Sequence, residues 1–189
     1  PWGVAFLCGG GMEPLLKELV PDLPELLLFA PQADWERDYT PWPAPVLPNR
    51  DPFLGGGPGF LRFLTETAKP WLDARYPTLP GPEHTLLAGY SLAGLFALWA
   101  ACNTDLFGRV ASLSGSLWYE GWVDYLQEHR PDADSRIYLS LGKREGYAPS
   151  TAHSPAAEPP SGTTRELQTS AEAPQPPRSP MAAVGDCTQ

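Results

Sequence analysis

The chain has 189 residues, a length that fits one domain with a single sizeable core. Its formal net charge of -9 at pH 7 argues against nucleic acid or an anionic membrane as a partner. The three cysteines are widely spaced and form no CxxC pair, so the sequence indicates neither a disulfide framework nor a zinc site, and we expect a reducing, cytoplasmic compartment. No signal peptide opens the chain, which begins at Pro1 rather than Met, so its natural start could lie upstream.

The first part of the chain alternates apolar runs of strand length with a helical pattern. Strands are predicted at 3–8 and 25–30, with a helix over 13–20 between them. Residues 34–59 are rich in Pro and Gly and are predicted to form a long irregular loop. A loop of that length is usually functional or disordered, and its aromatic residues favour a packed, functional one.

The middle of the chain continues the same alternation. Apolar residues at helical spacing predict an amphipathic helix over 60–76, kinked at Pro70 because proline has no N–H to donate. The remaining predicted elements, in chain order, are a strand at 84–89, a helix over 92–102 that is apolar on nearly every side, a strand at 109–115, a helix marked by Trp118, Trp122, Val123 and Leu126, and a strand at 136–142.

Strands that alternate with helices, each strand a continuous apolar run, predict an α/β fold with a doubly wound, mainly parallel sheet covered on both faces. From Ala148 onward the composition changes to Pro, Ala, Ser, Thr and Glu, with few large apolar residues. Such a segment buries too little apolar area to offset its chain entropy. We therefore expect one domain over 1–147 and a disordered tail over 148–189.

Ser91 stands in the apolar stretch LLAGYSLAGLFALWA, directly after a predicted strand and before a predicted buried helix. This places it at the carboxyl edge of a parallel sheet, where open α/β sheets bind ligands, and beside free helix N–H groups that suit an anionic intermediate. The pattern is that of the strand–nucleophile–helix elbow, G-x-S-x-G, with Ala93 in place of the second glycine. We expect Ser91 at the end of the middle strand of five, with strained backbone. The alternative is an ordinary tight turn with a solvated serine.

Several stretches together carry a resemblance to a known family. AGYSLAGLFALWA, DLFGRVASLSGSLWYEGW, IYLSLGKRE and ADWERDYTPWPAP, all within residues 3–145, are similar to the esterase D / enterochelin-esterase-like branch of the α/β-hydrolase superfamily. The resemblance implies hydrolysis of carboxylic esters or thioesters, or acyl transfer, with a small-molecule ester as partner and no metal or organic cofactor. It stops between Gly142 and Tyr147, which implies a hydrolase fold lacking the family's last strand and helix.

The resemblance also assigns roles where positions match. The resemblance implies that Ser91 is the nucleophile and that the N–H groups of Leu92 and Gly10 form the oxyanion hole. Glu145 occupies the position of the acid that orients the histidine. Two alternatives stay open: the glycine run at 9–11 could be a plain strand-to-helix turn, and Glu145 could be an exposed loop carboxylate.

Three further residues are candidate substrate contacts. Trp35 and Arg37 follow the second strand near the same sheet edge, where Arg37 could address a substrate carboxylate or phenolate. Trp118 follows SLSGS and could line the pocket. The alternatives are a loop anchored by an aromatic ring and by a salt bridge of Arg37 with a neighbouring aspartate, and a core aromatic at Trp118.

A serine hydroxyl is a weak nucleophile unless a base accepts its proton. His84 starts the third strand at the end of the sheet opposite Ser91, and His129 falls near the end of a surface helix. His153 follows Glu145 but sits in the Pro-rich tail, which cannot hold a base in place. We therefore weigh a slow esterase against a non-catalytic binding protein that uses the same pocket, with a nucleotide-binding domain as a third, distant alternative.

Overall fold

The computed structural model describes residues 1–10, 25–45 and 52–142, and every structural statement below concerns these residues. Four predicted features lie outside these residues and stay predictions: the helix over 13–20, the acid at Glu145, the position of His153 and the domain boundary after residue 147.

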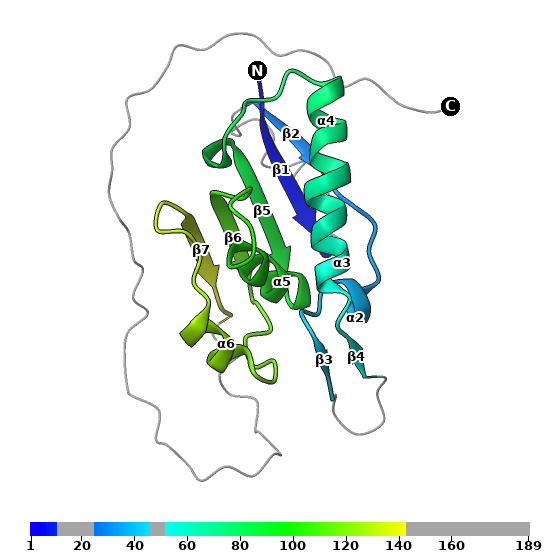
Figure 1. Ribbon diagram of the computed structural model, residues 1–189, viewed down its shortest axis with the longest axis vertical. Coiled ribbons are helices and arrows are strands. Elements are labelled where there is room, and N and C mark those ends of the chain that lie inside the picture. The colour runs from blue at the N-terminus through cyan, green and yellow to red at the C-terminus, as the bar shows by residue number, and fades with distance from the viewer. Residues whose placement is uncertain (11–24, 46–51, 143–189) are drawn as a thin grey trace. The chain divides into compact units, whose positions relative to one another are not determined.

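Five parallel strands form the central sheet, in the order β2-β1-β5-β6-β7 (Figure 1). Their bounds are Gly3–Cys8 for β1, Leu26–Phe29 for β2, Thr85–Tyr90 for β5, Arg109–Leu113 for β6 and Arg136–Ser140 for β7. The predicted α/β fold with a parallel sheet is confirmed. The strand that leads into Ser91, β5, is the middle one of the five, as predicted.

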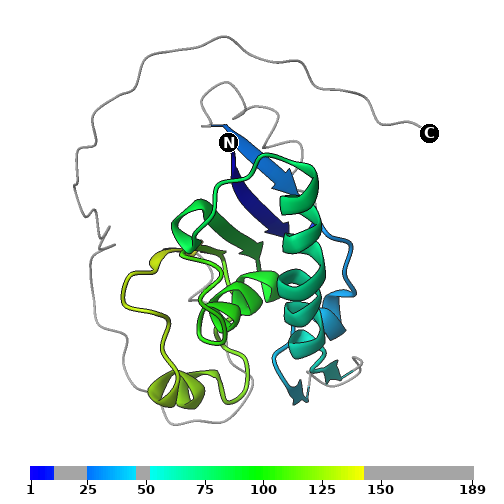
Figure 2. The ribbon, with the colours of Figure 1, turned by 45° about the horizontal axis from the view of Figure 1, so that its top comes forward.

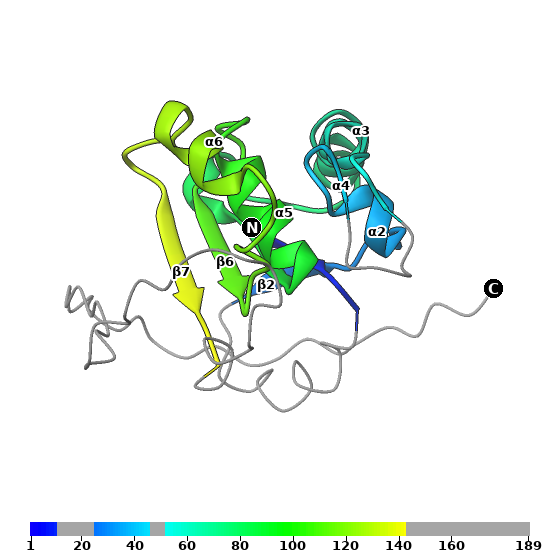
Figure 3. The same ribbon diagram turned by 90° about the horizontal axis from the view of Figure 1, so that it is seen from below.

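The described helices lie on one face of this sheet (Figure 3). Their bounds are Trp35–Asp38 for α2, Gly57–Arg62 for α3, Lys69–Arg75 for α4, Leu92–Ala101 for α5 and Trp122–Glu128 for α6. Val4 and Phe6 of β1, with Leu87 of β5 and Val110 of β6, point into the core between sheet and helices. On the opposite face Ala5, Leu7 and Ala88 form a second buried cluster.

Helix α5 is the central element of the core. All ten of its residues are buried, and none of them is charged. Its sequence, LAGLFALWAA, is apolar on every side, which is typical of a helix packed on all faces. The predicted burial of this helix is confirmed, and it places the N-terminus of α5 at the carboxyl end of β5.

The described parts of the predicted loop over 34–59, residues 34–45 and 52–59, are not irregular as predicted. They contain α2, a short antiparallel pair of strands, β3 (Pro43–Ala44) and β4 (Phe53–Leu54), and the start of α3. Thr40, which is fully buried, ties these pieces together. Its hydroxyl donates to the Glu36 carbonyl at 2.8 Å and accepts the Gly55 N–H at 2.9 Å. The second bond joins positions fifteen residues apart, which a reading of local propensity does not detect.

The long helix after this segment runs over Gly57–Arg75 as one continuous rod (Figure 2), but it is distorted earlier than predicted. A π-helical turn, Phe63–Ala68, precedes Pro70, and the Lys69 N–H donates to the carbonyl of Leu64, five residues back. The π-helical turn therefore changes the hydrogen-bond pattern from four residues back to five just before Pro70, which has no N–H to donate.

Two predictions near the end of the described chain are wrong in part. Strand β7 is not buried: Tyr138 and Leu139 are 61% and 56% exposed, because β7 is an edge strand that pairs only with β6 among the described strands. Helix α6 begins at Trp122, so Trp118 precedes it rather than belonging to it. No helix in the described ranges is both long and apolar enough to cross a bilayer.

We expect Thr40→Val to destabilise the fold by about 1–3 kcal/mol, because it leaves the half-buried Gly55 N–H without its buried acceptor. Chemical denaturation of the two proteins measures the difference. Thr65→Val is the matched control, since the Thr65 hydroxyl only donates one long bond, 3.3 Å, to the carbonyl of Arg62. Equal losses in the two variants would contradict the role given to Thr40.

Candidate active site

Ser91 occupies the turn between β5 and α5 with φ 56° and ψ -119°. A positive φ is unfavourable for any residue with a Cβ, so the backbone strain predicted for this position is confirmed. Two backbone hydrogen bonds fix the turn to the neighbouring strand and loop. The Ser91 N–H donates to the Leu113 carbonyl at 3.0 Å, and the Ser91 carbonyl accepts the Ser116 N–H at 3.0 Å.

The small residues around Ser91 are required by close backbone contacts. A Cβ on Gly89 would lie 2.1 Å from the carbonyl oxygen of Ala93, so no other residue fits there. Ala93, in the place of the second glycine of the elbow pattern, is fully buried, and its Cβ faces Gly9. A Cβ on Gly9 would come within 3.2 Å of it. The alanine is therefore accommodated because the residue opposite is glycine.

The candidate oxyanion hole lies between two adjacent strands. Cys8 of β1 and Gly89 of β5 are register partners, so the turn after β1 and the turn after β5 meet at the same sheet edge. Leu92 is the first residue of α5, and its N–H has no carbonyl partner within the helix. In the turn after β1, Gly9 and Gly10 have φ of 105° and 53°, and no heavy atom lies within 4 Å of a Cβ position on Gly10.

The hydrogen bond of Gly9 distinguishes the two glycines. The Gly9 N–H donates to the Tyr39 phenol at 3.0 Å and is therefore already used. Among the described residues of the turn this leaves the Gly10 N–H, which stays our predicted donor. The structure thus brings Ser91, Leu92 and Gly10 together, while Glu145 lies outside the described residues.

The phenol also contacts the thiol at the end of β1. Burial raises the pKa of Cys8 to about 12, although a hydrogen bond from Tyr39 opposes the rise, so Cys8 stays a neutral thiol. Burial likewise raises the pKa of Tyr39, which keeps its proton at neutral pH. The thiol of Cys8 and the phenol of Tyr39, which lie beside the candidate oxyanion hole, are therefore both uncharged near pH 7.

The candidate substrate contacts are placed in different ways. The Trp35 ring lies 3.5 Å from a Cβ position on Gly9, so it borders the oxyanion turn. The Trp118 side chain is 71% exposed, with its ring centroid 6.3 Å from that of Phe53, so it is not a core aromatic. Trp35 is therefore half-buried beside the oxyanion turn, whereas Trp118 is open to solvent.

Arg37 is held by its neighbour. Its Nε and Nη2 donate to the two carboxylate oxygens of Asp38 at 2.8 and 3.1 Å. Partial burial alone would raise the pKa of Asp38, but the hydrogen bonds from Arg37 and from the Asp34 N–H hold that pKa below its ordinary value. The anchoring salt bridge considered as an alternative is therefore present, and an anionic substrate group would have to compete with it.

The Ser91 hydroxyl has one described partner, the hydroxyl of Ser116, at 3.3 Å. Ser116 is buried, and sequence reasoning missed it. Neither histidine in the described ranges stands near this edge. His84 ends the short helix η3 (Pro82–His84) before β5, at the opposite end of the strand, and His129 stacks on Tyr125 with ring centroids 4.0 Å apart.

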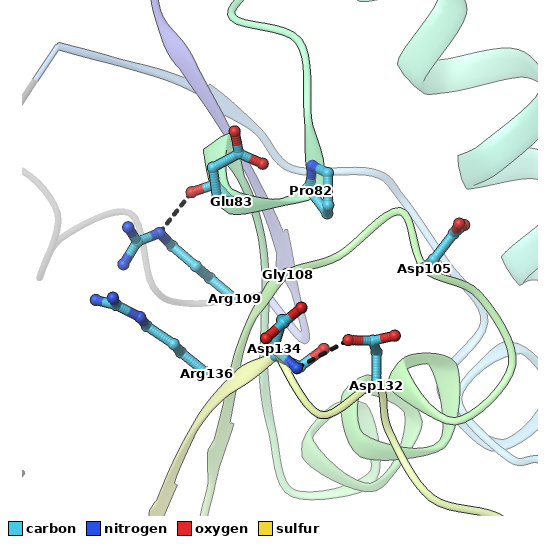
Figure 4. A pocket seen from close by; sticks show the side chains of 9 residues that line it. Pro82, Glu83, Asp105, Gly108, Arg109, Asp132, Asp134 and Arg136 are labelled. Atoms are coloured by element: carbon cyan, nitrogen blue, oxygen red, sulfur yellow. Dashed lines mark hydrogen bonds between the residues drawn. The ribbon is translucent and has the colours of Figure 1, made fainter.

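The opposite edge of the sheet carries a surface pocket of about 410 Å³ (Figure 4). Arg109 and Arg136, the first residues of β6 and β7, are register partners and lie side by side there. Arg109 Nε donates to the Glu83 carbonyl at 2.6 Å. This pocket lies at the amino ends of the strands, away from the edge where parallel sheets place their ligands, so it is not part of the candidate active site.

The comparisons with known proteins agree with this architecture. The sequence model of the family described as "Putative esterase" matches residues 12–174, so the chain belongs to that family. It is 33% identical over 129 residues to "Uncharacterized protein YbbA" of Bacillus subtilis (strain 168), a match that covers 66% of this chain and 51% of YbbA. The chain thus spans about half the length of that relative.

Two solved structures illustrate the likeness of fold. An IroE-like serine hydrolase from Shewanella oneidensis superposes with a TM-score of 0.57 at 27% identity, over 67% of this chain and 45% of that one. The siderophore hydrolase EstA from Aspergillus nidulans superposes with a TM-score of 0.58 at 20% identity, over 83% of this chain and 61% of that one. The fold is therefore that of the α/β-hydrolase esterases.

We expect Gly89→Ala to disrupt the elbow, because the added methyl group would overlap the backbone of the first turn of α5. The variant should lose several kcal/mol of stability or fail to fold, as overpacking at a backbone contact does. Thermal unfolding measures this effect. Gly59→Ala is the control: a Cβ on Gly59 meets nothing within 4 Å, so this helical substitution should be neutral or stabilising by about 0.5–1 kcal/mol. A stable, unperturbed Gly89→Ala protein would contradict the geometry described for the turn.

Proposed function

We propose that the chain hydrolyses carboxylic esters through an acyl-enzyme formed on Ser91. The observation that carries the proposal is the strained Ser91 backbone, held at the end of the middle strand and at the N-terminus of a buried helix. Membership in an esterase family supports it, as does the likeness to a serine hydrolase that is 27% identical. Strain of this kind persists only where the surrounding structure enforces it, and it is concentrated at functional sites.

The proposed reaction uses side chains and backbone N–H groups only, so it needs no metal or organic cofactor. The Ser91 oxygen attacks the ester carbonyl carbon, and its proton passes to a base. The carbonyl oxygen becomes an oxyanion between the N–H groups of Leu92 and Gly10. Their hydrogen bonds to this oxygen strengthen as its negative charge develops. The C–O bond to the alcohol then breaks, the alcohol takes up a proton, and water hydrolyses the acyl group from Ser91 in the same manner. Glu145 remains our proposal for the acid that orients the base.

The substrate contacts are proposed from position and chemistry. Trp35 beside the oxyanion turn and the exposed Trp118 would contact the acyl and alcohol parts of an ester that carries aromatic or apolar groups. EstA is a siderophore hydrolase, so a siderophore ester is the first natural substrate class to test, with simple aryl esters and thioesters as the others.

One observation favours a second candidate function, that of a binding protein without catalysis. The described partner of the Ser91 hydroxyl is another serine, which is a poor general base at neutral pH. Such a protein would hold an ester or its acid in the same pocket without turnover. Binding measured by calorimetry, together with no release of product over days, would identify this second function.

We expect Ser91→Ala to abolish both covalent labelling by a fluorophosphonate and hydrolysis of a short-chain fluorogenic ester. Mass spectrometry of the intact protein and product fluorescence measure the two effects. Because general-base catalysis contributes roughly 10²–10⁴-fold, a chain without a positioned base should still label and turn over slowly through its oxyanion hole. His153→Ala should then leave the rate unchanged.

The matched control for this experiment is Ser135→Ala, which removes a hydroxyl at the opposite end of the sheet, beside the pocket of Figure 4. It should label and turn over like the unmodified chain. Labelling that persists in Ser91→Ala would show that the nucleophile is another residue.

A further inference from the structure

We infer that Tyr39 is a positioning residue that holds the candidate oxyanion hole in shape, acting on it through the backbone of Gly9. The inference rests on the proposed function, because it concerns the same site. Tyr39 would contact neither the substrate nor the reacting atoms. Its task would be to fix the turn that presents the Gly10 N–H to the substrate.

A hydrogen bond of the phenol lies beneath the turn. The Gly9 N–H donates to the Tyr39 oxygen at 3.0 Å. The thiol of Cys8, the residue before Gly9, is near enough to the phenol that each group affects the pKa of the other. The bond to Tyr39 thus holds the carboxyl end of β1 one residue before Gly10.

The ring of Tyr39 has little freedom to follow a moving turn. The residue is 2% exposed, and its ring meets those of Trp35, Phe60 and Phe96 at centroid distances of 5.5, 5.6 and 6.0 Å. It also follows directly on α2 and precedes Thr40, whose hydroxyl bonds to two other parts of the segment. The phenol oxygen is therefore a fixed point to which the glycine turn is attached.

The turn after β1 needs such a fixed point because its described residues are two glycines. Gly9 and Gly10 both have positive φ, and glycine visits many other backbone conformations at little cost. An oxyanion hole stabilises the transition state only if its donors are already oriented, and a misplacement of about 1 Å can cost roughly 100-fold in rate. Loss of the phenol oxygen should therefore weaken stabilisation of the tetrahedral state and leave ground-state binding of the ester almost unchanged.

The test compares Tyr39→Phe with Tyr119→Phe. Tyr119 is also 2% exposed, and its hydroxyl donates to the carbonyl of Trp42 at 2.5 Å, away from the glycine turn. Both variants thus remove one buried hydrogen-bonded oxygen. For each we would measure kcat and KM for an aryl ester, the affinity for an arylboronic acid that forms a tetrahedral adduct on serine, and amide exchange at Gly9 by NMR.

Tyr39→Phe should lower kcat and the affinity for the boronic acid by about 10-fold or more. This is less than the roughly 100-fold loss expected when an oxyanion donor is removed, because the Gly10 N–H stays present but is less well oriented. KM should change by less than twofold. Tyr39→Phe should also speed amide exchange at Gly9 by about the same factor as it lowers kcat, because that N–H loses its acceptor. Tyr119→Phe should change none of these by more than twofold. Equal effects in the two variants, or a rise in KM alone after Tyr39→Phe, would overturn the inference.

Two further outcomes keep the inference separate from the proposed function. If the unmodified chain neither labels nor hydrolyses esters, the proposed function fails, and amide exchange at Gly9 still decides whether Tyr39 positions the turn. If Tyr39→Phe does not fold, amide exchange in the unmodified chain takes its place. The Gly9 amide should exchange at least about 10-fold more slowly than an unprotected amide, because its N–H donates to the Tyr39 oxygen, and exchange at the unprotected rate would contradict the inference.

Discussion

The turn at Ser91 is the constraint on which the rest of the structure depends. The chain must leave the middle strand and enter a buried helix at a single residue with positive φ. That is possible only because Gly89 has no Cβ to meet the carbonyl of Ala93. The apolar helix α5 then has one way to pack, against β5 and β6, and its first N–H groups lie at the sheet edge. Burial of α5 thus sets both the core and the geometry of the candidate nucleophile.

The second half of the site comes from a part of the chain distant in sequence. The segment over 34–59 is closed on itself by Thr40 and carries Trp35 and Tyr39 to the glycine turn after β1. Flexible glycines are thereby held by a rigid aromatic cluster. The proposed oxyanion hole would depend on this combination, because glycine lets the backbone approach a substrate and the cluster supplies the orientation that glycine lacks.

The sequence predicts the local features of this protein better than the distant ones. Each of the five strands is found within two residues of its predicted bounds, because a continuous apolar run is a local signal. Ser91 is recognisable for the same reason. The bond from Gly9 to Tyr39 spans 30 residues and the contact of Ser91 with Ser116 spans 25, so no local pattern reveals them. The exposure of β7 depends on strand order, which a list of strands does not contain.

The most direct test of the account is a crystal structure of the chain treated with an arylboronic acid. The account predicts a tetrahedral boron atom bonded to the Ser91 oxygen, with one boronate oxygen about 2.7–3.1 Å from the N–H groups of both Leu92 and Gly10. A boronate bound to another residue, or an adduct at Ser91 whose oxygens meet neither N–H group, would contradict it.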